Sequence, residues 1–317
     1  MHLRDEVQQI LLLKMIHRFR EINLSLRKEL QTVSLRIMIQ LIADSGSTKT
    51  DWRLVKNNEQ TTAFQTEGLN PYHLSDLVIL HILGENVLPH MQQTPDEIHF
   101  YGAGCAAEEN KQEMLSCFKH FFPDAQIEIE TDLLGAARAL LNDQKGVVAI
   151  LGTGSNAGIY DGKKISKSFD SLGWFLGDEG SGVNIGKLIL RDWLRGKFAS
   201  KLSKALAQYC PLTRDEILQR IYNEEKPLAF VAGFAKFAHE QIASHQIKEI
   251  LREAFYHFIR EVTYVFKITS KTQLHFCGSI AWHFQNQLAE EVRGYELWMG
   301  TVLQSPIDAL VKYHSSK

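Results

Sequence analysis

Residues 39–55 read IQLIADSGSTKTDWRLV, and this stretch decides the fold of the chain. An apolar segment at 39–43 comes before a turn rich in Gly, Ser and Thr, and a second strand-like segment follows at 50–55. Glycine lets a backbone come close to a ligand, and the N–H groups of such a turn can hold a phosphate. The turn lacks the Gly-Lys-Ser/Thr ending of a P-loop, so we expect a hairpin that either binds phosphate or is an ordinary turn.

A second turn of this kind stands at residues 152–158, GTGSNAG, directly after the apolar segment 147–151. A dinucleotide-binding fingerprint would need Gly at position 157 and a helix next. Residue 157 is Ala, and residues 159–163 are typical of a strand that ends in an Asp-Gly turn, so the sequence disfavours a Rossmann site. Two similar hairpins that open two halves predict a clamp around one polyphosphate, with a plain β-turn as the alternative.

Strand and helix patterns alternate from Met38 onward, which indicates an α/β protein. Further strands are predicted at 97–101, 126–130, 146–151 and 273–276, and helices at 76–87, 108–121, 133–141, 183–209, 213–223, 228–243, 247–266 and 307–313. The length of 317 residues fits two domains, expected at 38–145 and 146–317, with the last helix packed back on the first domain. Residues 1–37 carry seven Lys and Arg against four Asp and Glu. We interpret them as an extension that is either loosely ordered or included only because the translation start was assigned upstream of Met38.

Composition limits the class of protein. The formal net charge of -2 disfavours a nucleic-acid binder, which needs a basic surface. No run approaches the roughly 18 apolar residues of a membrane span, and a signal-peptide cleavage site is lacking, so we expect a cytoplasmic protein without a membrane partner. No CxxC pair or metal-ligand spacing occurs, which predicts free and mostly buried thiols. The four cysteines are Cys105, Cys117, Cys210 and Cys277.

Acidic residues and a further small-residue turn are the remaining candidates for chemistry. Asp132 follows a strand and precedes a small-residue helix, so it is the best candidate for a catalytic group, with a helix N-cap as the alternative. Asp178 and Glu179 stand among the glycines of residues 173–182, where we expect them to face a polar ligand or to cap the following helix. The turn CGSIA at 277–281 has small residues that suit packing against an adenine or a ribose.

These segments occur in the order of one known family. Residues 38–313 resemble the BadF/BadG/BcrA/BcrD-type ATPase and N-acetylglucosamine kinase family, and five motifs carry the resemblance, at 44–52, 131–132, 152–156, 173–182 and 277–281. The resemblance implies the two-domain actin, hexokinase and Hsp70-like fold, which is ribonuclease H-like, with ATP and Mg²⁺ in the cleft between the domains.

The resemblance also implies roles for individual residues. Asp132 would be the catalytic base, and Asp44 would hold Mg²⁺, directly or through water. The residues implied in nucleotide binding are Asp44, Gly46, Ser47, Thr48, Lys49, Gly152, Thr153, Gly154, Ser155, Gly278 and Ser279. The residues implied in sugar binding are Asn70, Thr153, Gly173 and Asp178. With His73 aligned, the sugar-binding Asn of the family falls on Tyr72, and Asn70 is taken as the contact.

The activity that the resemblance implies is ATP-dependent phosphorylation of an amino sugar, N-acetylglucosamine first and N-acetylmuramic acid second. The radical-enzyme activators of the same superfamily hold an iron–sulfur cluster through cysteines of two subunits, and the scattered cysteines of this chain favour the kinase. An ATPase that activates or regulates a partner protein is the alternative. The oligomeric state stays open, a homodimer included.

Overall fold

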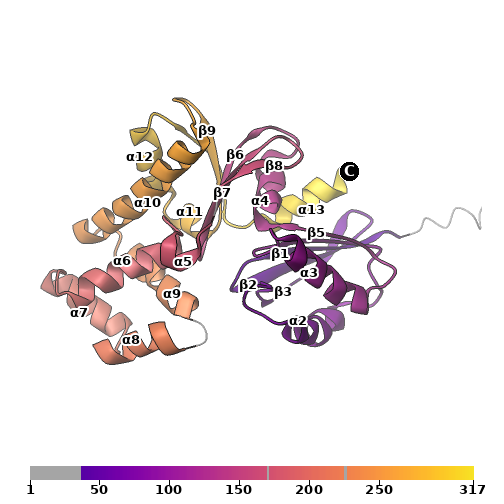
Figure 1. Ribbon diagram of the computed structural model, residues 1–317, viewed down its shortest axis with the longest axis horizontal. Coiled ribbons are helices and arrows are strands. Elements are labelled where there is room, and N and C mark those ends of the chain that lie inside the picture. Colours follow the sequence, from indigo (N-terminus) through magenta and orange to yellow (C-terminus); the bar gives the residue numbers. More distant parts are fainter. Residues whose placement is uncertain (1–36, 170, 225–226) are drawn as a thin grey trace, which may run out of the picture. The chain divides into compact units, whose positions relative to one another are not determined.

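The computed structural model describes residues 37–169, 171–224 and 227–317. One unit runs from Ile39 to Lys317 and contains two five-stranded sheets that follow one another along the chain (Figure 1). The extension predicted at 1–37 lies outside the described residues, apart from Ile37, whose side chain is exposed.

The first sheet has the strand order β3-β2-β1-β4-β5. Its strands are β1 (Ile39–Ser45), β2 (Lys49–Lys56), β3 (Glu59–Glu67), β4 (Glu97–Gly102) and β5 (Gln126–Thr131). The first three form an antiparallel meander, and β4 and β5 join β1 in parallel. Because β1, β4 and β5 are parallel, their carboxyl ends lie at the same edge, where α/β sheets place their chemistry.

The second sheet repeats this topology in the order β10-β9-β6-β7-β8. Its strands are β6 (Gly146–Leu151), β7 (Ser155–Tyr160), β8 (Ile165–Ser168), β9 (Gln273–Cys277) and β10 (Trp298–Leu303). Strands β6, β7 and β8 are antiparallel neighbours, and β9 and β10 extend the sheet in parallel with β6. Strand β6 therefore occupies the place of β1, and the two predicted hairpins, β1–β2 and β6–β7, are equivalent.

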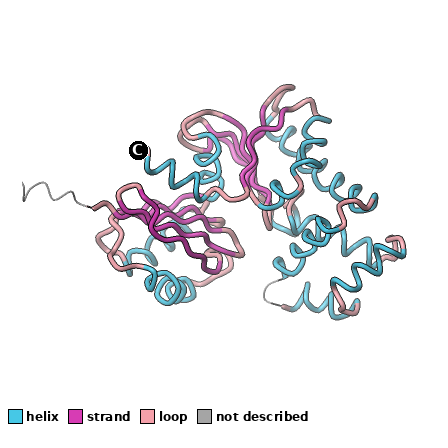
Figure 2. Tube along the Cα trace, turned by 180° about the vertical axis from the view of Figure 1, so that it is seen from behind, coloured by secondary structure: helices cyan, strands magenta, loops and turns pink. Residues whose placement is uncertain are grey.

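Helices follow the strands of each half. In the first half, α2 (Asp76–Ile82), with a π-helical turn (Leu83–Val87) and a 3-10 turn (Leu88–His90), and α3 (Glu108–Phe121) cover one face of the sheet. The second half contains α5 (Gly173–Leu176), α6 (Gly182–Leu194), α7 (Ser200–Tyr209), α8 (Arg214–Asn223), α9 (Pro227–Glu240), α10 (His245–Phe266), α11 (Ser279–His283) and α12 (Gln285–Gly294). Figure 2 shows the two groups of strands with helices beside each.

One predicted helix is wrong. The segment 183–209 is two helices, because α6 ends at Leu194 and α7 begins at Ser200. Gly196 lies between them with a φ of 69°, a left-handed conformation that commonly ends helices at glycine.

The helices that end the two halves cross to the opposite sheet. Helix α4 (Asp132–Leu141) follows β5, yet its apolar side chains form a buried cluster with Val148 and Tyr160 of the second sheet. Helix α13 (Ile307–Ser315) follows β10, and it packs against Ile42 and Val55 of the first sheet. The boundary near 143–145 stays a prediction; the chain passes there from α4 to β6.

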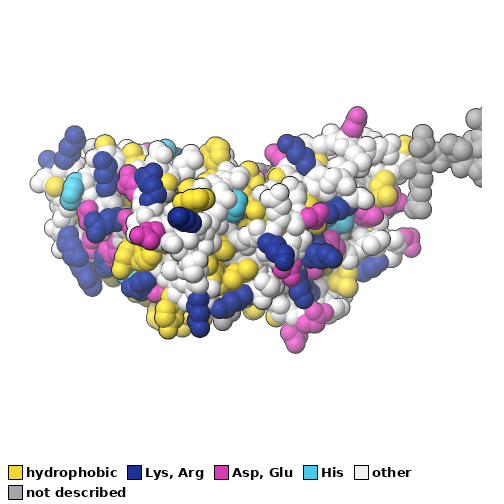
Figure 3. All heavy atoms as spheres, turned by 90° about the horizontal axis from the view of Figure 1, so that it is seen from above, with side chains coloured by type: hydrophobic (Ala, Val, Ile, Leu, Met, Phe, Trp, Pro, Cys, Tyr) yellow, Lys and Arg dark blue, Asp and Glu magenta, His cyan; other side chains and the backbone are white. Residues whose placement is uncertain are grey.

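The surface charges and the state of the cysteines can be compared with what the composition predicts. Positive and negative side chains are interspersed on the face shown in Figure 3. The predicted thiols are confirmed, since all four cysteines are free and buried. In the part of the chain that the structure describes, no helix is long and apolar enough to cross a membrane.

Candidate active site

The first Gly-rich turn joins β1 to β2. The N–H of Gly46 donates to the carbonyl oxygen of Lys49 at 3.0 Å, which closes the turn. Below it, the buried hydroxyls of Ser45 and Thr50 are hydrogen-bonded at 2.8 Å. The exposed residues of the turn are Ser47, Thr48 and Lys49. The turn is therefore anchored from inside, and its outer residues are exposed.

The segment after β3, which begins at Gly68, packs against the backbone of this turn. A Cβ at Gly68 would lie 2.2 Å from the carbonyl oxygen of Gly46, so only glycine permits the approach. This brings Asn70, which is 6% exposed, to the turn, and its Nδ2 donates to Ser47 Oγ at 3.1 Å. Tyr72 is 65% exposed, so Asn70 rather than Tyr72 provides the buried polar contact here.

The second Gly-rich turn joins β6 to β7 and is bound to the start of α6. The N–H of Gly152 donates to the carbonyl oxygen of Gly154 at 3.0 Å. The N–H groups of Gly182 and Val183 donate to the carbonyl oxygens of Gly152 and Thr153 at 2.8 and 3.1 Å, respectively. The first turn of α6 therefore fixes the conformation of the second hairpin.

Asp178 contacts the same hairpin and does not cap α6. Its Oδ1 accepts the N–H of Ser155 at 3.0 Å, and its backbone has a φ of 60°, which is strained for a residue other than glycine. Burial raises the pKa of this carboxyl. The helix is capped by Ser181, whose hydroxyl accepts the N–H of Asn184, so the capping alternative for Asp178 is wrong.

The turn between β9 and α11 lies against the second hairpin. Gly278 has a φ of 114°, and a Cβ there would lie 2.3 Å from the carbonyl oxygen of Leu151, so the position requires glycine. Ser279, the first residue of α11, is exposed. The two hairpins also meet directly, with the hydroxyl oxygens of Thr48 and Thr153 3.3 Å apart. Three turns thus converge around the predicted nucleotide site.

Asp132 begins α4 directly after β5. Its Oδ1 accepts the N–H of Leu133 at 2.8 Å. The N-cap is Thr131, whose Oγ1 accepts the N–H of Leu134 at 3.2 Å, so the capping alternative for Asp132 is wrong. Burial raises the pKa of Asp132 to about 6, although backbone N–H groups oppose the shift. The carboxylate therefore combines ionisation near neutral pH with a fixed orientation, as a general base requires.

Asp44 lies near the end of β1, close enough to Asp132 for their charges to interact. Burial raises the pKa of Asp44 to about 7, the charges of Asp132 and Asp51 raise it further, and Lys49 opposes them. Two carboxylates that repel each other in this way form an oxygen donor set that suits a hard divalent cation. The residues present therefore fit a hard divalent cation such as Mg²⁺.

Two other predicted residues have distinct surroundings. Lys49 forms an ion pair with Asp51 at 2.8 Å, and its side chain is 58% exposed. Gly173 begins α5 with a φ of 70°, and apart from its chain neighbours and the backbone of its own helix, no described atom lies within 4 Å of the place that its Cβ would take. Sequence reasoning missed the capping role of Ser181, although Ser directly before an apolar helix is an N-cap signal.

One solved structure is similar over nearly its whole length. It is a protein of Porphyromonas gingivalis with the provisional name N-acetylglucosamine kinase, and the match has 35% identity, covers 87% of this chain and 99% of that chain, and has a TM-score of 0.82. This chain belongs to the BadF/BadG/BcrA/BcrD-type ATPase and N-acetylglucosamine kinase family. The resemblance drawn from the five sequence motifs is thus confirmed.

More distant structures share the fold of the family. A Chromobacterium violaceum protein, also provisionally named N-acetylglucosamine kinase, matches with 16% identity and a TM-score of 0.66 over 87% of this chain and 99% of that chain. A glucokinase of the ROK family from Streptomyces griseus, solved with glucose and AMPPNP, matches with 11% identity and a TM-score of 0.54 over 87% of this chain and 97% of its own. The two-domain actin, hexokinase and Hsp70-like fold is therefore confirmed. No protein-family model and no curated protein match the sequence.

Proposed function

We propose that this chain is an ATP-dependent sugar kinase whose acceptor is an amino sugar, N-acetylglucosamine in the first place and N-acetylmuramic acid in the second. The observation that carries the proposal is the pair of half-buried carboxylates with raised pKa values, Asp44 and Asp132, at the carboxyl edge of the first sheet. Phosphoryl transfer to an alcohol needs a cation ligand and a base that accepts the hydroxyl proton. The name of the P. gingivalis relative supports N-acetylglucosamine as the first sugar to test.

The converging turns would bind the nucleotide. In this proposal the backbone N–H groups of residues 46–49 and 152–155 hold the phosphates, and Gly278 and Ser279 line the adenosine. The contact between Thr48 and Thr153 supports this, because it brings the tips of the two hairpins together. Glycine at 278 lets this turn pack closely against the backbone of Leu151 and Gly152 at the second hairpin.

Asp132 would carry the chemical step. Its carboxylate accepts the proton of the sugar hydroxyl while the hydroxyl oxygen bonds to the γ-phosphorus, and the bond from that phosphorus to the bridging oxygen of ADP breaks. Asp44 would hold Mg²⁺, which neutralises phosphate charge when it is bound. The N–H of Leu133 orients the carboxylate of Asp132, so the base would need little reorganisation in the transition state.

The sugar would lie near Asn70, Thr153, Gly173 and Asp178 in this proposal. Asn70 and Asp178 are both nearly buried polar residues, and each contacts one of the two hairpins. A sugar held between them would present a hydroxyl to the phosphates. The open space around Gly173 leaves room for a substituent on the ring.

The test is a panel of amino sugars, each assayed for ADP release with ATP and Mg²⁺. We expect N-acetylglucosamine to raise ADP release well above the rate without sugar, with one phosphorylated sugar formed for each ADP. ATP hydrolysis that no sugar alters would refute the kinase and favour the activator or regulator of a partner protein. The burial of all four thiols supports the kinase, because a cluster shared between subunits needs accessible cysteines.

A further inference from the structure

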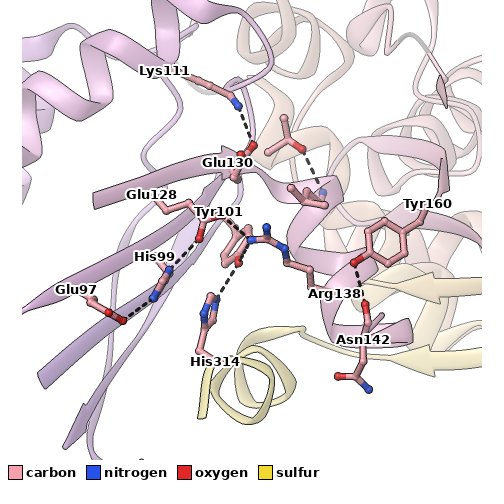
Figure 4. A network of polar contacts seen from close by, with 12 residues as sticks. Glu97, His99, Tyr101, Lys111, Glu128, Glu130, Arg138, Asn142, Tyr160 and His314 are labelled. Carbon is pink, nitrogen blue, oxygen red and sulfur yellow. Dashed lines mark hydrogen bonds and ion pairs between the residues drawn. The ribbon is translucent and has the colours of Figure 1, made fainter. Parts of the chain in front are cut away.

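A network of polar side chains joins the first sheet to α4 and α13, and Tyr101 is at its centre (Figure 4). Tyr101 is fully buried on β4. Its hydroxyl accepts a hydrogen bond from Arg138 Nη1 of α4 at 2.6 Å and is hydrogen-bonded to His314 Nε2 of α13 at 2.9 Å. The same Arg138 nitrogen donates to Glu128 Oε1 at 2.9 Å. The hydroxyl of Tyr101 is therefore held by both crossing helices.

Part of this network has the composition of a metal site but not the geometry. His99, Glu128 and His314 bring nitrogen and oxygen atoms within 4.8 Å of one another. The two imidazole rings are stacked, with centroids 3.7 Å apart and planes 21° from parallel. Their nitrogen lone pairs lie in nearly parallel planes and cannot converge on one ion. Arg138 also neutralises Glu128, so the network is suited to joining elements rather than to binding a cation.

The ring of Tyr101 lies directly under α4. A Cβ at Gly135 would lie 2.8 to 2.9 Å from Cβ, Cγ and Cδ1 of Tyr101, so the helix rests on the ring with no room for a methyl group. Asp132 stands three residues before Gly135 and Arg138 three residues after it. Residues three apart lie on the same side of a helix. The turn of α4 that carries Asp132 is therefore supported by this ring.

The same residue is a neighbour of the second carboxylate. In the parallel pairing of β1 and β4, Tyr101 is the register partner of Asp44. Residues paired in this way project to the same face of a sheet. Tyr101 thus touches the strand that carries Asp44 and the helix turn that begins with Asp132.

We propose that Tyr101 is a positioning residue whose ring sets the separation between Asp44 and Asp132, and whose hydroxyl is held in place by Arg138 and His314. The network would thereby couple the placement of α13 to the two carboxylates. The catalytic consequence rests on the sugar kinase function proposed above, whereas the effect on the separation does not.

Gly135→Ala is the most direct test. Alanine is a better helix former than glycine by up to about 1 kcal/mol, yet its methyl group would clash with the Tyr101 ring, so stability alone does not distinguish a structural role from a positioning role and the kinetic constants must decide. If the ring positions Asp132, the added methyl must displace the start of α4. Because a misplacement of about 1 Å can cost about 10²-fold in rate, we expect kcat to fall between about 10- and 100-fold. The KM values for ATP and sugar should stay within about twofold, since only the reacting groups are misaligned.

Tyr101→Phe tests the hydroxyl, and Tyr160→Phe is its matched control. Tyr160 is also fully buried against α4, and its hydroxyl donates to the carbonyl oxygen of Asn142 at 2.8 Å, at the far end of that helix. Both changes remove one buried hydroxyl. We expect a fall in kcat of at least about fivefold for Tyr101→Phe, with little change in KM, and less than about twofold for the control. Wild-type kcat values for both Tyr101→Phe and Gly135→Ala would overturn the proposal.

Crystal structures of wild type and Gly135→Ala provide a readout that needs no activity. We expect the carboxyl groups of Asp44 and Asp132 to change their separation in the variant, and an unchanged separation would overturn the positioning role. Wild-type protein that shows no sugar-dependent ADP release would refute the proposed function instead. The structures would still decide whether Tyr101 and Gly135 set the separation.

Discussion

Replacing Asp132 with Asn should separate a base from a residue that only supports the fold. The amide oxygen of Asn can still accept the N–H of Leu133, and Thr131 continues to cap α4. An amide cannot take the proton of a sugar hydroxyl. General-base catalysis contributes typically 10²- to 10⁴-fold, so kcat should fall by about that factor while the KM for sugar changes little.

The same change should stabilise the protein at high pH. Burial raises the pKa of Asp132 from 3.8 to about 6, so the charged form is disfavoured in the folded state. At about 1.36 kcal/mol for each pKa unit, the carboxylate costs up to about 3 kcal/mol of folding free energy above pH 6, and nothing below the unfolded value near pH 4. The Asn variant carries no such cost, so its advantage over wild type should appear as pH rises from 4 to 6.

Two assays check these expectations. The kcat is measured by sugar-dependent ADP release, and the free energy of unfolding by urea titration at pH 4 and pH 8. Asp161→Asn is the matched control, because Asp161 Oδ1 accepts the N–H groups of Lys163 and Lys164 in an exposed turn between β7 and β8. The control should leave kcat unchanged.

Either assay can refute the reasoning. If Asp132→Asn keeps more than about a tenth of wild-type kcat, Asp132 is not the base, and Asp178 becomes the next candidate. If the variant is no more stable than wild type at pH 8, burial does not disfavour the charged carboxylate in the way described.

Four further outcomes are expected. Gly154→Val crowds the carboxylate of Asp178, since even a Cβ at 154 would lie 3.0 Å from its Oδ1, so the KM for ATP should rise about tenfold or more (~1.4 kcal/mol), whereas Gly233→Ala in α9 should leave it unchanged. A chain that begins at Met38 should fold and keep full activity, and an insoluble product would contradict this. Protein purified without oxygen should be colourless, and iron chelators should not alter ATP turnover; visible absorbance with bound iron and sulfide would restore the activator. Because burial raises the pKa of Asp132 to about 6, kcat should fall tenfold for each pH unit below about 6, and a rate that is flat down to pH 5 would argue against this base.

The two hairpins could be predicted from sequence because their signals are local. In each, an apolar strand, a Gly-rich turn and a second strand follow within 17 residues or fewer, at 39–55 and 146–160. Strands β3, β8 and β10 were missed. Strand β3 alternates exposed polar residues with half-buried ones such as Phe64, β8 has four mostly exposed residues, and β10 contains Gly300, so none has an apolar run. All three lie at sheet edges, where pairing with one neighbour rather than burial defines the strand.

Helix boundaries show a similar limit. The pattern of 183–209 has a helical period on both sides of Gly196, and only the left-handed backbone at that residue separates α6 from α7. Likewise, Asp132 and Asp178 both lie near the start of a helix, where an aspartate side chain is a suitable N-cap. The backbone conformation assigns those caps to Thr131 and Ser181 instead.

The sequence by itself determined the α/β class, the two Gly-rich hairpins and the placement of Asp132 after a strand, because backbone propensity and turn chemistry act over a few neighbouring residues. Only the tertiary structure decided that Asp132 comes close enough to Asp44 for their charges to interact, that Thr48 meets Thr153, and that Tyr101 of β4 pairs with Asp44 and packs under α4. These arrangements depend on parallel strand register and on helices that cross to the opposite sheet to bury their apolar faces. Burial of this kind joins segments that are distant in sequence, and no local pattern specifies which of them will meet.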